Sequence, residues 1–219
     1  MARGKAATFE QQRLAILGAA ALLFAQRGFH SASMAEIARA CGVSKPLLYH
    51  YYRDKEHLLF DIADNYIDRL VALVESVDAA RLEALPHLEA LIARFLEIYA
   101  SSQSHHAVIV QDVKFLRPEL RTSVRAKEGR VVAAFADAIE RVEPGLRRQG
   151  LDKPVAMILF GMINWTFTWL RPDGPLSYAD MAPIVSRIFI QGVSGLAGAR
   201  QTTKSRATTA DPIHAISKG

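Results

Sequence analysis

The sequence predicts an all-α protein of about nine helices. Apolar side chains recur every three or four residues along most of the chain, which is the spacing of one face of an α-helix. The breaks between these stretches carry glycine, proline or a capping residue, and no run alternates apolar and polar residues as a half-buried strand would. With 219 residues, half of them hydrophobic, the chain can bury a substantial core without disulfides.

The first two predicted helices are delimited by capping residues and glycines. A first helix is expected from Thr8, which can cap its first turn, to a stop at Gly28. Ser33 is followed three residues later by Glu36, and this Ser-x-x-Glu pattern is a capping box, in which each side chain satisfies a backbone N–H of the other residue. The helix that it opens stops at Gly42 and is therefore very short.

A third and a fourth helix are predicted directly afterwards. The third helix spans residues 44–51, with Pro46 in the first turn, where a missing N–H removes no hydrogen bond. The turn before it consists of the three residues 41–43. Asp54 is expected to cap a fourth, longer helix that runs to about Ala79, with apolar residues along one face.

The remainder of the chain repeats this helical pattern. The predicted helices are Leu88–Ser101, His105–Phe115, Glu119–Val142, Asp152–Leu170 and a last helix that begins at Ser177. We expect residues 1–57 to form a three-helix domain and residues 58–200 to form a helical body. Residues 201–219 are rich in Thr, Ser and Lys without periodicity, which predicts a disordered tail.

The positive charge is concentrated in the N-terminal domain. Residues 1–57 contain eight Lys or Arg against four Asp or Glu, whereas residues 58–200 contain sixteen against seventeen. A compact basic module on a nearly neutral body is typical of a nucleic-acid-binding protein.

Other classes of protein leave signatures that this sequence lacks. Cys41 is the single cysteine, no apolar segment follows a basic N-terminus, and no apolar run reaches the roughly 18 residues of a membrane span. A cytoplasmic protein without a cofactor is therefore expected. No HExxH, CxxC, Walker or GxSxG motif occurs, and the stripe Asp61, Asp64 and Asp68 is better explained as a solvated helix face than as a magnesium site, so catalysis is not expected.

The second and third predicted helices, joined by a three-residue turn that contains glycine, have the layout of a helix-turn-helix motif. The run from Val43 to Leu58, VSKPLLYHYYRDKEHL, resembles the signature of the tetracycline-repressor (TetR) family, in which the third helix ends in Leu-Tyr-x-x-aromatic and the fourth begins Ser/Asp-Lys-Glu-x-Leu. The resemblance covers the N-terminal domain, although Pro46 departs from the small residue common at that place. It implies a homodimeric repressor that binds a double-stranded DNA operator and is released by a small ligand.

Chemistry and the resemblance together suggest which residues contact DNA. Lys45 can reach a base edge or a phosphate, and Leu47 can touch a thymine methyl group. Hydroxyls at helix N-termini and polar aromatic rings suit phosphate contacts. The predicted DNA-binding residues are Ser33, Ser44, Lys45, Pro46, Leu47, Tyr49, His50 and Lys55, whereas Leu48 and Tyr52 are assigned to the core. Arg3 and Lys5 form a basic arm that could enter the minor groove.

The last two helices are expected to form the dimer interface. The helix at 152–170 is apolar nearly all round, and the last helix carries an unbroken apolar series, so both need partners on more than one side. The resemblance implies a four-helix bundle between two subunits, with Ile184, Val185, Ile188, Phe189 and Gly192 at the interface. Monomer core is the alternative explanation for the same residues.

The body is also expected to contain an apolar ligand cavity. Its predicted lining is Phe95, Tyr99, His106, Ile109, Phe115, Met162, Asn164, Trp165 and Phe167. The stretch from Phe160 to Gly174 resembles TetR-family regulators of fatty-acid, phenylacetate and steroid catabolism, several of which respond to acyl-coenzyme A thioesters. Coenzyme A phosphates could then pair with Arg117, Arg121, Arg125 and Lys127, unless these residues are a solvated face. A hydrophobic or cationic drug is the alternative effector.

Overall fold

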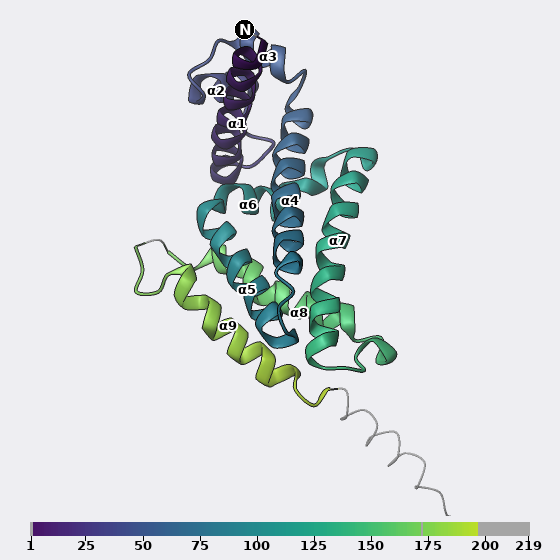
Figure 1. The fold of residues 1–219 in the computed structure, drawn as a ribbon. Coiled ribbons are helices and arrows are strands. Elements are labelled where there is room, and N and C mark those ends of the chain that lie inside the picture. The colour runs from purple at the N-terminus through teal and green to yellow at the C-terminus, as the bar shows by residue number, and fades with distance from the viewer. Residues whose placement is uncertain (1, 172, 197–219) are drawn as a thin grey trace, which may run out of the picture.

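The computed structural model describes residues 2–171 and 173–196, with side chains from Thr8 onward. These residues form nine α-helices, three short 3-10 helices and no strand, which confirms the predicted all-α class (Figure 1). The α-helices are α1 (Ala2–Arg27), α2 (Met34–Ala40), α3 (Lys45–Tyr51), α4 (Lys55–Ala79), α5 (Ala84–Ser101), α6 (Gln103–Asp112), α7 (Pro118–Val142), α8 (Asp152–Asn164) and α9 (Tyr178–Val193). The 3-10 helices are η1 (Val113–Phe115), η2 (Arg147–Gln149) and η3 (Trp165–Thr168).

The predicted capping residues mark where the helices begin. The side chains of Ser33, Ser44 and Asp54 each accept a hydrogen bond from the backbone N–H three residues later, and Ser33 forms the expected capping box with Glu36. Ser177 forms a second such box at the start of α9. Local hydrogen bonding therefore sets these boundaries, as the sequence predicted.

Several predicted boundaries are wrong. Helix α5 begins at Ala84 rather than at Leu88, and the helix predicted to end at Phe115 ends at Asp112 and continues as η1. Helix α1 begins at Ala2 rather than at Thr8, because the preceding residues include alanines, an arginine and a lysine, which favour continuation of the helix over a cap. The α-helix predicted for 152–170 ends at Asn164 and tightens into η3. The predicted disordered tail and the side chains of Arg3 and Lys5 lie outside the described residues.

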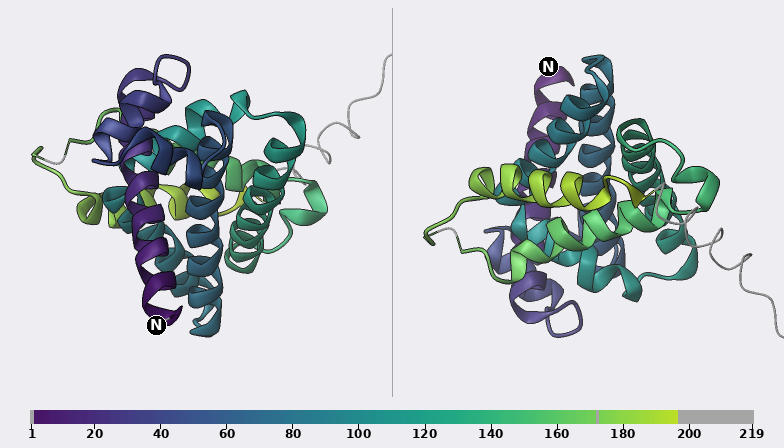
Figure 2. Two further views of the ribbon diagram at one scale, coloured as in Figure 1. Left: turned by 90° about the horizontal axis from the view of Figure 1, so that it is seen from above. Right: turned by 90° about the horizontal axis from the view of Figure 1, so that it is seen from below.

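The helices form two packed groups joined by α4 (Figure 1). Helices α1 to α3 lie at one end with the first half of α4, while α5 and α7 pack against its second half. Helix α9 packs on α5, and α8 packs on α7. Helix α6 packs against both α1 and α4, so it lies between the two groups. Seen from below, α8 and α9 run side by side across the far end of the body (Figure 2).

Each group has its own hydrophobic core. The N-terminal core holds Ile16, Phe24, Ile37, Leu48 and residues of α4 up to Ala63, together with a few residues of α6, η1 and α7. The predicted domain boundary at 57/58 thus falls inside a continuous helix and stays a prediction. Among the described residues, no helix is long and apolar enough to cross a membrane.

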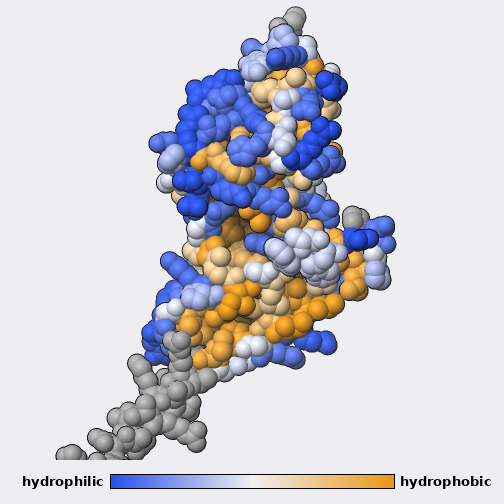
Figure 3. All heavy atoms as spheres, turned by 180° about the vertical axis from the view of Figure 1, so that it is seen from behind, coloured by the Kyte–Doolittle hydropathy of each residue, from blue (hydrophilic) through white to orange (hydrophobic). Residues whose placement is uncertain are grey.

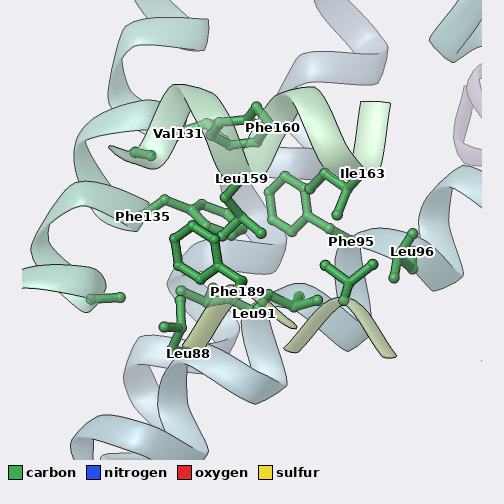
Figure 4. Close-up of a cluster of buried hydrophobic side chains, with 14 of the residues drawn as sticks. Leu88, Leu91, Phe95, Leu96, Val131, Phe135, Leu159, Phe160, Ile163 and Phe189 are labelled. Atoms are coloured by element: carbon green, nitrogen blue, oxygen red, sulfur yellow. The ribbon is translucent and has the colours of Figure 1, made fainter. Parts of the chain in front are cut away.

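The larger core fills the body with aromatic and branched side chains. Phe95, Phe135 and Phe160 pack edge to face or tilted, with ring centroids 4.8 to 6.2 Å apart. Figure 4 shows these rings among side chains of α5, α7, α8 and α9, with Phe189 of α9 pointing inward. Such a close-packed centre holds the four helices in one arrangement.

Polar contacts also connect α1 and the end of α3 to α4. Asp61 accepts a hydrogen bond from the hydroxyl of Tyr52 at 2.5 Å and forms an ion pair with Arg13. All three side chains are at least partly buried, so these hydrogen bonds cannot simply be replaced by bulk water. The ring of Tyr52 in turn packs in the N-terminal core.

Replacing Asp61 with asparagine should lower the free energy of unfolding by about 1–3 kcal/mol, because Arg13 would keep only Glu10 as a charged partner and Tyr52 would lose its charged acceptor. Urea denaturation followed by circular dichroism measures this change. Asp68→Asn is the control, since Asp68 is an exposed member of the pair with Lys127. Equal stability of the Asp61 and Asp68 variants would show that the Asp61 network does not hold the domain.

Candidate DNA interface and effector cavity

Helices α2 and α3 form the predicted helix-turn-helix. The turn is possible because Gly42 adopts a left-handed conformation, with φ of +65°, which non-glycine residues rarely adopt. At the start of α2, the Ser33 backbone N–H donates to Glu36 Oε2 at 2.9 Å, and Glu36 N–H donates to Ser33 Oγ at 3.2 Å. The Ser33 backbone N–H and the Ser33 hydroxyl both donate to the Glu36 carboxylate, and these two hydrogen bonds lower the pKa of Glu36. Ser33 and Ser44 therefore act as caps, and their contact with phosphate stays a prediction.

Helix α3 is anchored on one side and open on the other. Leu48 is fully buried in the N-terminal core, and Tyr52 follows the helix into the same core, as predicted. All the side chains expected to contact DNA except Lys55 lie on the exposed surface. They are Ser33, Ser44, Lys45, Pro46, Leu47, Tyr49 and His50. The Lys45 ammonium lies 5.9 Å from the centre of the Tyr49 ring, so a cation and a hydrogen-bonding aromatic group share this face.

Lys55 differs from the prediction of a phosphate contact. Its Nζ donates hydrogen bonds to the carbonyl oxygens of Phe29, His30 and Ala32 at 2.6, 3.0 and 2.9 Å, and it lies 4.6 Å from the centre of the Phe29 ring. An ammonium has three N–H donors, so none remains for a phosphate. Desolvation lowers the pKa of Lys55. We therefore correct its role to holding the loop between α1 and α2 against α4.

A cavity of about 210 Å³ opens inside the body. It is lined by Ile67, Leu70, Tyr99, His106, Ile109, Glu128, Val131, Val132, Met157, Phe160 and Asn164. Four of the predicted lining residues, Tyr99, His106, Ile109 and Asn164, are thus brought together from three helices. The walls are mostly apolar with a few polar groups, which is the usual composition of a small-molecule site.

The polar groups of the cavity are connected by hydrogen bonds. Tyr99 donates its hydroxyl hydrogen to Asn164 Oδ1 at 2.7 Å, and His106 stacks on the Tyr99 ring at a centroid distance of 4.0 Å. His106 Nδ1 lies 3.3 Å from the hydroxyl of Tyr66, and His106 Nε2 lies 3.3 Å from the carbonyl oxygen of Asn164. Burial lowers the pKa of His106 to about 4, so its ring is neutral at pH 7.

The other predicted lining residues lie elsewhere. Phe95 is buried in the large core, and Met162 packs against that core. Trp165 is 63% exposed because the chain tightens into η3 and turns its ring outward. Phe167 contacts His106 edge to face but does not line the cavity. The sequence could not distinguish residues of the core from residues that line the cavity, because both sets are mostly apolar.

Phe115 is the clearest correction among the predicted ligand contacts. It lies at the end of η1, stacks on Phe29 with ring centroids 5.8 Å apart and meets His30 at 4.3 Å. Both partners belong to the loop between α1 and α2. Phe115 therefore joins the body to the group of helices α1 to α3 instead of lining the cavity.

Glu128 is a cavity residue that the sequence analysis did not assign. It lies on α7 one turn before Val131 and Val132, which also line the cavity. Burial raises the pKa of this carboxyl, and nearby Arg125 only partly opposes the shift. A signal did exist in the sequence, since Glu128 shares the helix face of the buried residues Val124 and Val131.

Three of the four basic residues considered for coenzyme A phosphates, all except Arg125, already have partners within the protein. Arg117 pairs with Glu56 at 2.8 Å, and Lys127 bridges Asp64 and Asp68 at 2.6 and 2.7 Å. Arg121 donates to the carbonyl oxygen of Lys114 at 3.2 Å.

Within residues 2–171 and 173–196, no cluster of three or more His, Cys, Asp or Glu residues could hold a metal ion.

The predicted dimer residues are divided between two faces of α9. Val185 and Phe189 are buried in the core of their own subunit, which corrects their assignment, because α9 packs this face on α5. Ile184, Ile188 and Gly192 lie on the opposite, exposed face, where Ile188 is 59% exposed. Leu196, beyond the end of α9, is exposed as well.

Helix α8 and η3 expose further large apolar side chains next to this face. They are Met157, Ile158, Trp165 and Trp169, each at least half exposed. Figure 3 shows hydrophobic surface gathered on the body, while the end of the molecule that contains α1 to α3 is largely hydrophilic. An apolar patch of this kind is typical of a protein interface.

Comparison with known proteins identifies both parts of the chain. Residues 16–62 match the family described as bacterial regulatory proteins, tetR family, and residues 82–193 match the tetracyclin repressor-like C-terminal domain. The HTH-type transcriptional repressor KstR2 of Rhodococcus jostii (strain RHA1) is 28% identical over 192 residues, which cover 84% of this chain and 91% of that protein.

Solved structures agree with these matches. A TetR-family transcriptional regulator from Bordetella parapertussis 12822 has a TM-score of 0.77 and 34% identity, and the match covers 81% of this chain and 93% of that one. AibR, solved in complex with isovaleryl coenzyme A and operator DNA, has a TM-score of 0.71 and 27% identity, with 81% and 97% covered. Because both domains match TetR family models and these relatives are TetR-type regulators, the chain belongs to the TetR family of transcriptional regulators.

Proposed function

We propose that this protein is a homodimeric repressor that binds a palindromic operator and is released when a small acyl-CoA thioester enters the cavity. The observation that carries the proposal is the exposed face of α3, which presents Lys45, Leu47, Tyr49 and His50 while Leu48 fixes the helix to the domain. A helix held in this way can enter the major groove without losing its contacts to the protein.

The cavity supports a small acyl group as the effector. Pockets for drug-sized ligands measure about 300–1,000 Å³, so a cavity of about 210 Å³ suits a short acyl chain, with coenzyme A outside. The side-chain N–H₂ of Asn164 can donate to a thioester carbonyl, because the Asn164 Oδ1 atom already accepts from Tyr99. AibR, whose structure contains isovaleryl coenzyme A, provides a precedent within the family.

A cationic drug is the second candidate effector, and a specific observation favours it. The cavity contains the carboxyl of Glu128, for which no hydrogen bond or ion pair is present among the described residues. A ligand cation would satisfy this group. Such an effector would make the protein a regulator of drug efflux.

The contacts of α6 and η1 suggest how the cavity is coupled to DNA binding. His106 and Ile109 line the cavity, and Phe115, a few residues later, stacks on the loop next to α2. A ligand that moves α6 would therefore change the position of the DNA-binding end. Release requires only that the ligand bind more tightly to the displaced conformation.

Lys45→Ala should weaken operator binding and alter sequence preference, because an exposed cation at the start of the recognition helix is removed. Loss of a phosphate contact would also reduce the salt dependence by about one unit per contact. Fluorescence anisotropy at several salt concentrations measures both effects. Lys153→Ala is the matched control, because Lys153 is exposed at the start of α8. Equal affinity of the two variants would exclude α3 as the DNA-reading helix.

Ile188→Glu should convert the dimer into folded monomers, since Ile188 is exposed on the apolar face of α9 and contributes little to its own subunit's core. Sedimentation velocity at micromolar concentration, with circular dichroism for folding, measures the result. Leu22→Glu on α1 is the control for adding a charge at a similarly exposed apolar site. A monomeric wild-type protein would refute the proposed dimer.

Isovaleryl-CoA or phenylacetyl-CoA should lower operator affinity by roughly 100-fold, which corresponds to a coupling free energy of about 2.7 kcal/mol. The free acids and coenzyme A alone should release little. Asn164→Ala should weaken release about tenfold, because the proposed donor to the thioester is lost, and should leave operator affinity in the absence of ligand unchanged. Release by free coenzyme A, or only by a cationic drug, would contradict the acyl-CoA proposal.

A further inference from the structure

Glu128 places a carboxyl group in a cavity whose described lining residues include no cation. The lining residues include no lysine and no arginine, and His106 is neutral because burial lowers its pKa to about 4. The cation whose charge lowers the pKa of Glu128 is Arg125, one turn earlier on α7 and exposed to solvent. A ligand placed beside Val131 therefore meets a carboxyl group without a counter-ion within the cavity.

The hydrogen bonds of the described residues leave Glu128 available to a ligand. Its neighbour Lys127 is held by Asp64 and Asp68, and Arg130 pairs with Glu75, so these cations on α7 are engaged elsewhere. Burial raises the pKa of Glu128, which shows that the ionised carboxylate is costly at this position. A second negative charge nearby would increase this cost.

We propose that Glu128 is the specificity-determining residue of the cavity and excludes anionic ligands. This inference rests on the proposed effector function of the same cavity. It restricts the effector to an acyl group whose carboxyl is masked, as in a thioester or an amide. A free acid of the same shape is rejected because its carboxylate would lie in the same apolar cavity as that of Glu128. The repressor would thereby respond to the activated acyl compound and ignore the unactivated acid.

Three probes of nearly equal size test the charge preference directly. They are isovalerate, isovaleramide and 3-methylbutylamine, which carry a negative charge, no charge and a positive charge. Binding is followed on the full-length protein without DNA, by ¹³C-methyl NMR of Ile67 and Ile109, which both line the cavity. In the wild type, the amide and the amine should bind at least about tenfold more tightly than the acid. A tenfold difference corresponds to a pKa shift of about one unit between neighbouring charged groups.

Glu128→Gln should reduce this preference towards equal affinity for acid and amide, because the side chain keeps its shape and loses its charge. Glu119→Gln is the matched control, since Glu119 lies on the same helix, is exposed and does not line the cavity. It should keep the wild-type preference. The wild-type comparison of acid and amide tests the proposal even if the Glu128 variant does not fold.

The proposal is overturned if the wild type binds isovalerate as tightly as the amide, or if Glu128→Gln keeps the wild-type ratio. It is also overturned if none of the probes shifts the Ile67 and Ile109 signals. One further outcome is that the wild type prefers the amine over the acid, that Glu128→Gln loses this preference, and that acyl-CoA fails to release the operator. This outcome would support the exclusion of anionic ligands by Glu128. That combination would refute only the acyl effector of the proposed function.

Discussion

Helix α4 is the constraint on which the rest of the structure depends, because one 25-residue helix contributes to both hydrophobic cores. Leu58 and Ile62 are buried with α1 to α3, while Ile67 and Leu70 are buried in the body and also line the cavity. Since packed interiors deform little, a displacement of the second half of α4 is transmitted to the first. The cavity and the recognition helix are therefore mechanically linked through the backbone itself.

Polar groups at the junction of the two cores make this link specific. Arg13 and Tyr52 bind Asp61 on the first half of α4, and Arg117 at the start of α7 pairs with Glu56. Lys55 holds the loop between α1 and α2 through three carbonyl oxygens. Directional hydrogen bonds fix the orientation of the DNA-binding end in a way that apolar packing alone does not.

Helix α6 buries two ionisable side chains, and burial of such groups is energetically costly. His106 and Asp112 are both at least 94% buried, and burial raises the pKa of Asp112 while it lowers that of His106. Asp112 accepts a hydrogen bond from the backbone N–H of Phe29, so the far end of α6 contacts the DNA-binding end as directly as η1 does. Buried polar groups of this kind reduce stability and are typical of functional positions.

The sequence by itself determined the all-helical class, the caps of α2, α3 and α4, and the family, because these depend on local signals. Ser33, Ser44 and Asp54 cap their helices through hydrogen bonds to residues three positions away, and Leu48 and Tyr52 follow from helical periodicity. Only the tertiary structure decided which apolar side chains line a cavity, fill a core or face outward. In the sequence, three aromatic residues look alike, each lying in an apolar stretch of a predicted helix: Phe115, Trp165 and Phe189. Their different surroundings in the structure result from how helices distant in the sequence pack together. The sequence did not reveal the hydrogen bonds of the Lys55 ammonium, nor that the Glu128 carboxyl has no hydrogen-bond or ion-pair partner among the described residues, since the partners of a charged group come from other elements of the fold.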